Sequence, residues 1–277
     1  MSAAGYDAER AEAEPSGLGV ASRNIFDSHA HYESKRFAPD RDRLLAQLPE
    51  RGVRYVLNAA CDFESAATGI KLAEKYDYIY ASAGFHPHEA KDAPSGFTAR
   101  LAQLLQHPKV RAVGECGLDY HYDFSPREVQ RKVFEQQLAL AVELDMPVII
   151  HDREAHADTL ALLKKYRPAG VVHCYSGSAE MAKELLSLGL YIGFTGVVTF
   201  KNARKVLEAA RAIPVERMLI ETDCPYMASE PQRGRRCDSG LLGYTAQALA
   251  REKGIDTQTL IDRTCKNALE LYRIAEK

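Results

Sequence analysis

The side chains of this sequence best suited to chemistry are histidines and carboxylates at or just past the ends of short apolar runs. The first run, Ile25-Phe26-Asp27-Ser28-His29-Ala30-His31, carries two histidines. Later runs lead to Glu115, His151, His173 and Asp223. Imidazole nitrogens and carboxylate oxygens are common ligands of divalent metal ions. The pattern therefore predicts a metal-dependent hydrolase.

His29 and His31 are two residues apart in the first run. On a strand, residues at this spacing point to the same face, so both rings could bind one ion. Imidazole favours zinc and other transition metals, whereas carboxylate favours magnesium and manganese. The alternative for this pair alone is one core histidine and one surface histidine.

Glu115 ends the apolar run that starts at Val110. A buried carboxylate is costly unless it is paired or bound to metal. Its two oxygens could bridge two ions, which two-metal sites hold about 3.5–4 Å apart; an ion pair with an arginine is the alternative. His151 and His173 close consecutive runs, and although either alone could be a core histidine, together they favour a shared site.

Asp223 follows the run Met218-Leu219-Ile220-Glu221-Thr222. An aspartate at this position could bind metal and accept a proton from water, whose pKa a divalent ion lowers toward 7. Asp223 and Glu115 are therefore the predicted catalytic carboxylates. Glu221 competes for this role, but it lies one step earlier on the strand, and we expect it behind the ligands.

Apolar runs alternate with helical patterns from residue 25 onward. We expect strands over residues 25–30, 53–58, 79–84, 110–115, 147–151, 170–173, 190–194 and 218–221. We expect helices over 41–47, 64–75, 98–106, 126–144, 154–165, 179–187, 202–210, 243–252 and 256–271. Ser125 is the expected N-cap of the long helix, with Pro126 in its first turn.

This order and length predict an α/β fold, a single-domain (β/α)8 TIM barrel over residues 25–277. A doubly wound open sheet is the rival. The barrel is favoured because no Gly-x-Gly-x-x-Gly turn follows the first strand. It is also favoured because a barrel brings the ligands of the first and last strands together. Residues 1–24, rich in Ala, Glu, Ser and Gly, are expected to be a disordered N-terminal tail.

Composition limits the possible partners and the cellular compartment. The formal net charge of −2 over 277 residues gives no overall footprint for nucleic acid, so a polyanion would be held by metal ions or a local basic patch. No apolar stretch is long enough to span a membrane. The 6 cysteines form no Cys-x-x-Cys pair. We therefore expect free thiols and a cytoplasmic protein.

Five motifs carry a family resemblance: Asp27-Ser28-His29-Ala30-His31, Gly84-Phe85-His86-Pro87-His88, Gly114-Glu115-Cys116-Gly117-Leu118-Asp119-Tyr120, His173-Cys174-Tyr175-Ser176-Gly177 and Glu221-Thr222-Asp223-Cys224-Pro225-Tyr226. With the terminal Asn267-Ala268-Leu269-Glu270-Leu271, they make residues 25–273 resemble the TatD-family metal-dependent deoxyribonucleases, which are amidohydrolase-like barrels.

The resemblance implies two or three divalent ions, of Mg, Mn or Zn. One ion would be held by His29, His31, Glu115 and Asp223, and the second by Glu115, His151 and His173. His86 would contact the scissile phosphate and Arg153 a phosphate oxygen; the planar fork of arginine matches phosphate geometry. The implied substrate is DNA, cleaved from single-stranded ends, with no membrane association and no obligate protein partner.

The sequence departs from the family at Cys237-Asp238-Ser239, where an Asn-Glu-Pro step is usual. We expect this loop to border the substrate channel, with Asp238 in place of the glutamate. Arg233, Arg235 and Arg236 precede it, and they form either a local patch for the DNA backbone or a solvated loop.

Two other functions remain open. Hydrolysis of a small amide, lactone or phosphoester would fit other amidohydrolase-like barrels, many of which bridge their metals with a carboxylated lysine where this chain has Glu115. A non-catalytic binding protein on the same barrel would be expected to have lost ligands, and all six are present.

Overall fold

The structure is a computed structural model that describes residues 22–276. Its eight strands form one parallel sheet in the order β1-β2-β3-β4-β5-β6-β7-β8. The strands are β1 (Ile25–Ala30), β2 (Val53–Asn58), β3 (Ile79–Ala83), β4 (Val110–Asp119), β5 (Val148–Arg153), β6 (Gly170–Val172), β7 (Tyr191–Phe194) and β8 (Met218–Ile220). An isolated bridge between Ala30 and Cys224 joins the β8 end to β1. The predicted TIM barrel is confirmed, and the open sheet is excluded.

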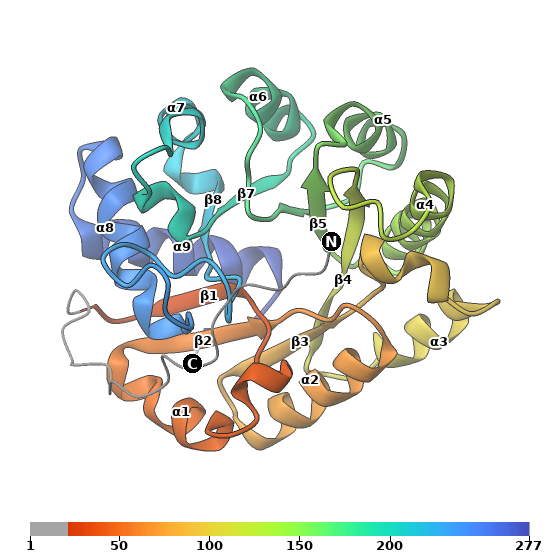
Figure 1. Cartoon of the computed structure of the whole chain (residues 1–277), viewed down its shortest axis with the longest axis horizontal. Helices are drawn as coiled ribbons and strands as arrows, with labels where there is room; N and C mark the ends of the chain where they lie inside the picture. The colour runs from red at the N-terminus through yellow and green to blue at the C-terminus, as the bar shows by residue number, and fades with distance from the viewer. Residues whose placement is uncertain (1–21, 277) are drawn as a thin grey trace.

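Helices surround the strands (Figure 1). They are α1 (Arg41–Gln47), α2 (Phe63–Lys75), α3 (Phe97–Leu104), α4 (Arg127–Glu143), α5 (His156–Tyr166), α6 (Ala179–Ser187), α7 (Arg204–Ala212), α8 (Leu242–Lys253) and α9 (Thr257–Leu271). Several of these helices are capped at their amino ends by a side chain. Asp62 and Ser65 form a reciprocal capping box on α2, and Ser178 and Asp256 cap α6 and α9.

The predicted cap of α4 is wrong. The backbone of Pro126 is still extended, so α4 begins at Arg127 without a side-chain cap. The Ser125 hydroxyl donates to the carbonyl of His88 at 2.8 Å and accepts from the Lys91 amide at 3.1 Å. Ser125 therefore stabilises the loop after β3 instead of the helix.

The interior of the barrel is filled by side chains of the strands and of α9. Phe26, Tyr55 and Ile149 belong to this cluster with Leu269 and Tyr272. Asn267 donates from its side chain to the carbonyl of Met218, the first residue of β8. The α9 helix thus packs at the amino ends of the strands. The polar side chains lie at the opposite, carboxyl ends of the strands.

Strands β4 and β5 approach each other closely beside the polar cluster. A Cβ atom on Gly117, whose φ is 146°, would lie 1.9 Å from the carbonyl oxygen of His151. The register between β4 and β5 shifts between Val113 and Cys116, and Glu115 falls in this shift. Because glycine allows such backbone contact, β4 can approach β5 where Glu115 and His151 lie.

Residues 1–21 of the expected N-terminal tail lie outside the described residues. From residue 22 the chain follows α9: the backbone amide of Arg23 donates to Gln258 at 3.2 Å, and the Asn24 side chain donates to Asp262 at 3.0 Å. In the described range no helix combines the length and apolarity that a bilayer crossing requires. All six cysteines are free thiols.

Candidate metal centre

The first and last strands bring their polar side chains together. Nε2 of His29 lies 3.0 Å from Nε2 of His31, and His31 Nε2 lies 3.3 Å from Oδ1 of Asp223. Asp223 is fixed by its backbone amide, which donates to the carbonyl of His29 at 2.9 Å. The barrel therefore joins residues about 190 positions apart in one cluster, as the fold prediction required.

Glu115 lies between two groups of imidazoles. Its Oε2 is 3.2 Å from His29 Nε2 and 3.6 Å from His31 Nε2. Its Oε1 is 2.8 Å from His173 Nε2 and 2.9 Å from His151 Nδ1. The two oxygens thus face different histidine nitrogens, and Glu115 is 2 % exposed.

These spacings fit divalent cations. Ligand atoms about 2.0–2.1 Å from one zinc ion lie about 3.0–3.4 Å from each other, close to the separations between His29, His31 and Glu115. Residues that could hold a metal also include groupings of His29, His31 and Asp223, and of His86, Glu115 and His151. The donors combine imidazole nitrogens, which suit zinc, with carboxylate oxygens, which suit magnesium and manganese.

Charge in the cluster favours an ionised carboxylate. Burial alone would raise the pKa of Glu115, but the imidazoles of His173, His86 and His29 hold that pKa well below its usual range. Burial opposes ionisation of Asp223 in the same way, and contact with His31 lowers the pKa of Asp223. Both carboxylates are thus negative at neutral pH, as cation ligands must be.

His86 comes from the loop after β3 and points into the same cluster. Its Nε2 lies 3.4 Å from Oε1 of Glu115, and its Nδ1 accepts a hydrogen bond from the His88 amide. Burial lowers the pKa of His86 to about 4, so the ring is neutral at pH 7. With Nδ1 as acceptor, the proton is assigned to Nε2, which faces the cluster.

Sequence reasoning missed Asp119. Its Oδ2 lies 3.1 Å from Nε2 of His151 and 2.9 Å from Nε2 of His88. A carboxylate on the far nitrogen of a histidine fixes the ring and raises its basicity. Here burial would lower the pKa of His151, but the hydrogen bonds to Asp119 and Glu115 raise that pKa to about 9.

A signal for Asp119 was present in the sequence. The strand was expected to stop at Glu115, whereas β4 continues to Asp119. Along the added residues, Glu115, Gly117 and Asp119 are spaced by two. The same alternation that paired His29 with His31 could therefore have placed Asp119 beside Glu115. His88, for which the sequence predicts no role, joins the site through Asp119.

Below the cluster, a buried network joins β1 to the segment after β8. Oδ2 of Asp27 accepts from the hydroxyls of Thr222 and Ser239, each at 2.6 Å. The Ser239 hydroxyl is also 2.7 Å from the hydroxyl of Tyr32. Burial raises the pKa of Asp27 to about 6. The Glu221 carboxylate accepts from the backbone amide of Cys174, and burial raises its pKa to about 7. With His29 and His173 it forms a further grouping that could hold a metal, and its place behind the ligands stays a prediction.

The loop at Cys237-Asp238-Ser239 is held by several contacts. Asp238 pairs with Arg51 at 2.9 Å, and Cys237 and Ser239 are buried. The Ser239 hydroxyl supports Asp27, and the expectation that the loop borders the substrate channel stays a prediction. Arg236 likewise pairs with Asp40 at 2.6 Å, so its charge is neutralised locally.

Arg153 lies at the end of β5, two residues past His151. Its guanidinium carbon is 4.7 Å from the centre of the Tyr122 ring.

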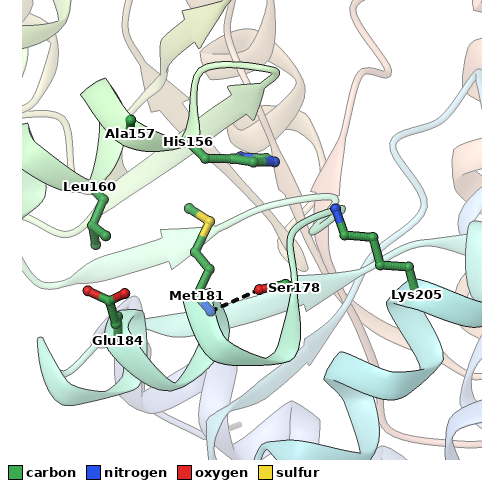
Figure 2. A pocket seen from close by; sticks show the side chains of 7 residues that line it. All are labelled: His156, Ala157, Leu160, Ser178, Met181, Glu184 and Lys205. Carbon is green, nitrogen blue, oxygen red and sulfur yellow. Dashed lines mark hydrogen bonds between the residues drawn. The ribbon is translucent and has the colours of Figure 1, made fainter.

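A separate hollow of about 290 Å³ lies between the starts of α5, α6 and α7 (Figure 2). It is lined by His156, Ala157, Leu160, Ser178, Met181, Glu184 and Lys205. None of these is a predicted ligand, so the metal-capable cluster is distinct from this hollow.

Comparison with known proteins agrees with the fold and shows the family. The model of the family described as "TatD related DNase" matches residues 26–273. The chain is 38 % identical over 253 residues to the "Uncharacterized metal-dependent hydrolase YabD" of Bacillus subtilis, covering 90 % of this chain and 99 % of the relative. It is 34 % identical over 259 residues to the "3'-5' ssDNA/RNA exonuclease TatD" of Erwinia tasmaniensis, covering 90 % and 100 %.

A solved structure gives the same result. The crystal structure of YJJV, a TatD homologue from Escherichia coli K12, superposes with a TM-score of 0.85 at 29 % sequence identity. The match covers 91 % of this chain and 99 % of that one. The chain therefore belongs to the TatD related DNase family of metal-dependent hydrolases.

Proposed function

We propose that this chain is a metal-dependent phosphodiesterase that removes nucleotides from the ends of single-stranded DNA. The observation that carries the proposal is the position of Glu115, whose two oxygens face different sets of histidine nitrogens. A carboxylate shared in this way suits a pair of divalent cations, which is a common arrangement in nucleases and phosphatases. Relatives named as 3'-5' ssDNA/RNA exonucleases support a single-stranded substrate.

In this proposal Glu115 would help to hold both ions. His29, His31, Asp223 and Glu115 would hold the first ion, and Glu115, His151 and His173 would hold the second. When bound, Mg, Mn or Zn polarises phosphoryl oxygens and lowers the pKa of water toward neutrality. Asp119 keeps Nδ1 of His151 directed at Glu115 by accepting from Nε2.

Asp223 is the proposed proton acceptor. Its ionised carboxylate is 9 % exposed and lies within 3.3 Å of His31, at the opening of the barrel. An ionised carboxylate beside an attacking water takes its proton as the bond to phosphorus forms. The neutral His86 presents its Nε2 proton toward the same space and would donate to an oxygen of the scissile phosphate.

Arg153 is the proposed second phosphate contact, because its guanidinium lies at the end of the strand that carries His151.

The position of Glu115 also favours this function over the lysine-bridged amidohydrolases. The strand β4, Val110–Asp119, contains no lysine that could be carboxylated.

The test is a substrate panel. Single-stranded DNA, single-stranded RNA and duplex DNA oligonucleotides, each labelled at one end, are incubated with the protein and Mg, Mn or Zn. We expect stepwise shortening of single-stranded DNA. A small amide, a lactone and a small phosphoester complete the panel. Turnover of one of these small substrates, with intact oligonucleotides, would favour the amidohydrolase-like alternative and exclude the proposed one.

A further inference from the structure

The exposed aromatic side chains of this protein gather on the face of the barrel that carries the metal-capable cluster. Among the described residues, the exposed large hydrophobic side chains are Tyr122, Phe124, Val142, Leu144, Tyr226 and Ile255. The three aromatic ones lie in segments that follow β4 and β8. The three aliphatic ones lie at the carboxyl ends of α4 and α8, toward the opposite face of the barrel.

Tyr122 and Phe124 form an ordered pair. Their ring centres are 5.2 Å apart with an angle of 18° between the rings, which is an offset stack. They remain 47 % and 57 % exposed, respectively. The loop that carries them is anchored, because the Asp119 carboxylate accepts from the backbone amide of Tyr122 at 2.9 Å.

The pair is connected directly to the cluster. The His88 ring meets Phe124 edge-on at 4.8 Å and Tyr122 at 5.5 Å. The same ring shares Oδ2 of Asp119 with His151. One histidine and one carboxylate therefore separate the exposed rings from a predicted metal ligand.

Arg153 places a cation over the Tyr122 ring. Its guanidinium carbon lies 4.7 Å from the centre of the Tyr122 ring, and it is the predicted contact of a phosphate oxygen. A planar aromatic surface beside a phosphate-binding cation matches a nucleotide, in which a base and a phosphate are linked through one sugar. Two rings are far too small a surface for a stable protein partner, which needs about 800 Å² on each side.

We propose that Tyr122 and Phe124 form a stacking platform for a nucleobase next to the scissile phosphate. This inference rests on the proposed nuclease function and adds the recognition of the base to it. Base stacking on aromatic rings depends little on base identity, because each base has a π-face. The platform therefore predicts preference for unpaired bases over paired ones, without strong sequence selectivity.

The test compares binding of oligonucleotides that carry or lack terminal bases. The protein as purified is titrated with a short single strand whose linkages are phosphorothioate, to slow cleavage. A matched strand carries stable abasic sites at its terminal positions. A third places 2-aminopurine at either end, since its fluorescence falls when the base stacks. The variants are Y122L/F124L, the ring-preserving Y122F, and V142A, which alters an equally exposed side chain on the opposite face.

For the wild type, Y122F and V142A, we expect tighter binding of the base-bearing strand and quenching of 2-aminopurine at the end that enters the site. In Y122L/F124L the base-bearing strand should bind about 5- to 100-fold more weakly, the range for loss of one stacked base, and about as weakly as the abasic strand. If both the wild type and Y122L/F124L bind the base-bearing strand more tightly than the abasic strand, the platform is wrong and the nuclease proposal stands. If the wild type binds no strand, both proposals are wrong.

Discussion

Oδ2 of Asp119 lies 3.1 Å from Nε2 of His151, while Nδ1 of the same imidazole lies 2.9 Å from Glu115. The ring is held at both nitrogens by carboxylates, one of which also contacts His88. Such a carboxylate orients a metal-binding histidine and sets which nitrogen carries the proton. Asp119 thus determines how one side of the cluster is presented to a cation.

Replacing this carboxylate should weaken metal binding. In D119N the amide keeps the shape of the side chain but loses its negative charge, so His151 and His88 lose a charged acceptor. We expect a loss of about 10- to 100-fold in metal affinity or activity, measured by metal titration and by nucleotide release. D123N alters an exposed aspartate four residues along the chain and is the control. Equal affinities for D119N and the wild type would show that Asp119 does not orient the ligand.

The hydroxyl of Ser239 should contribute to stability through Asp27. S239A removes a 2.6 Å hydrogen bond to a buried carboxylate, and hydrogen bonds to charged groups contribute about 1.5–3 kcal/mol. We expect the free energy of unfolding in urea to fall by about this amount. S187A removes an exposed serine hydroxyl at the end of α6 and is the control. It should change the free energy of unfolding by less than about 0.5 kcal/mol. If S239A lowered the free energy of unfolding no more than S187A does, Ser239 would not stabilise the fold through Asp27.

His156 gives a stability contribution that depends on pH. Its Nδ1 lies 2.8 Å from the buried Asp152 carboxylate, and this hydrogen bond raises the pKa of His156 above that of a free histidine. Because the folded-state pKa is raised, the contribution is fully present below about pH 6.5, the unfolded value, and is lost as the pH rises through the folded-state value.

Urea unfolding of the wild type and H156Q therefore should differ most near pH 6, and the difference should shrink toward pH 9. An NMR titration of His156 measures the raised pKa directly. A difference that stays constant across this range, or grows with pH, would contradict the assigned ion pair.

The fold and the cluster could be predicted because both follow from simple periodicities. Parallel strands buried on both faces read as continuous apolar runs, so their ends could be found to within a few residues. Since the carboxyl ends of barrel strands meet, the residues at those ends could be grouped without knowing any contact. His29 beside Asp223 is the clearest case, because only barrel closure joins them.

The features that could not be predicted from the sequence lie in loops and in extensions of strands. Asp119 was missed because β4 runs four residues further than its apolar pattern. Ser125 looked like a helix cap, yet it hydrogen-bonds to a loop far away in sequence. Ser239 reaches Asp27 over 212 positions. Side-chain contacts of this range are set by tertiary packing, which local pattern does not encode. The Tyr122–Phe124 pair was likewise invisible, because exposure cannot be read from residue type.

The most direct measurement is nucleotide release from a single-stranded DNA oligonucleotide by protein stripped of metal and then reloaded. The wild type should be inactive after chelation and regain activity with Mg, Mn or Zn. E115Q should regain little with any of them, because a neutral amide cannot hold two cations as a carboxylate can. E143Q, an exposed glutamate in α4, should behave as the wild type. Full activity in the chelated wild type, or in reloaded E115Q, would contradict a hydrolytic site built on Glu115.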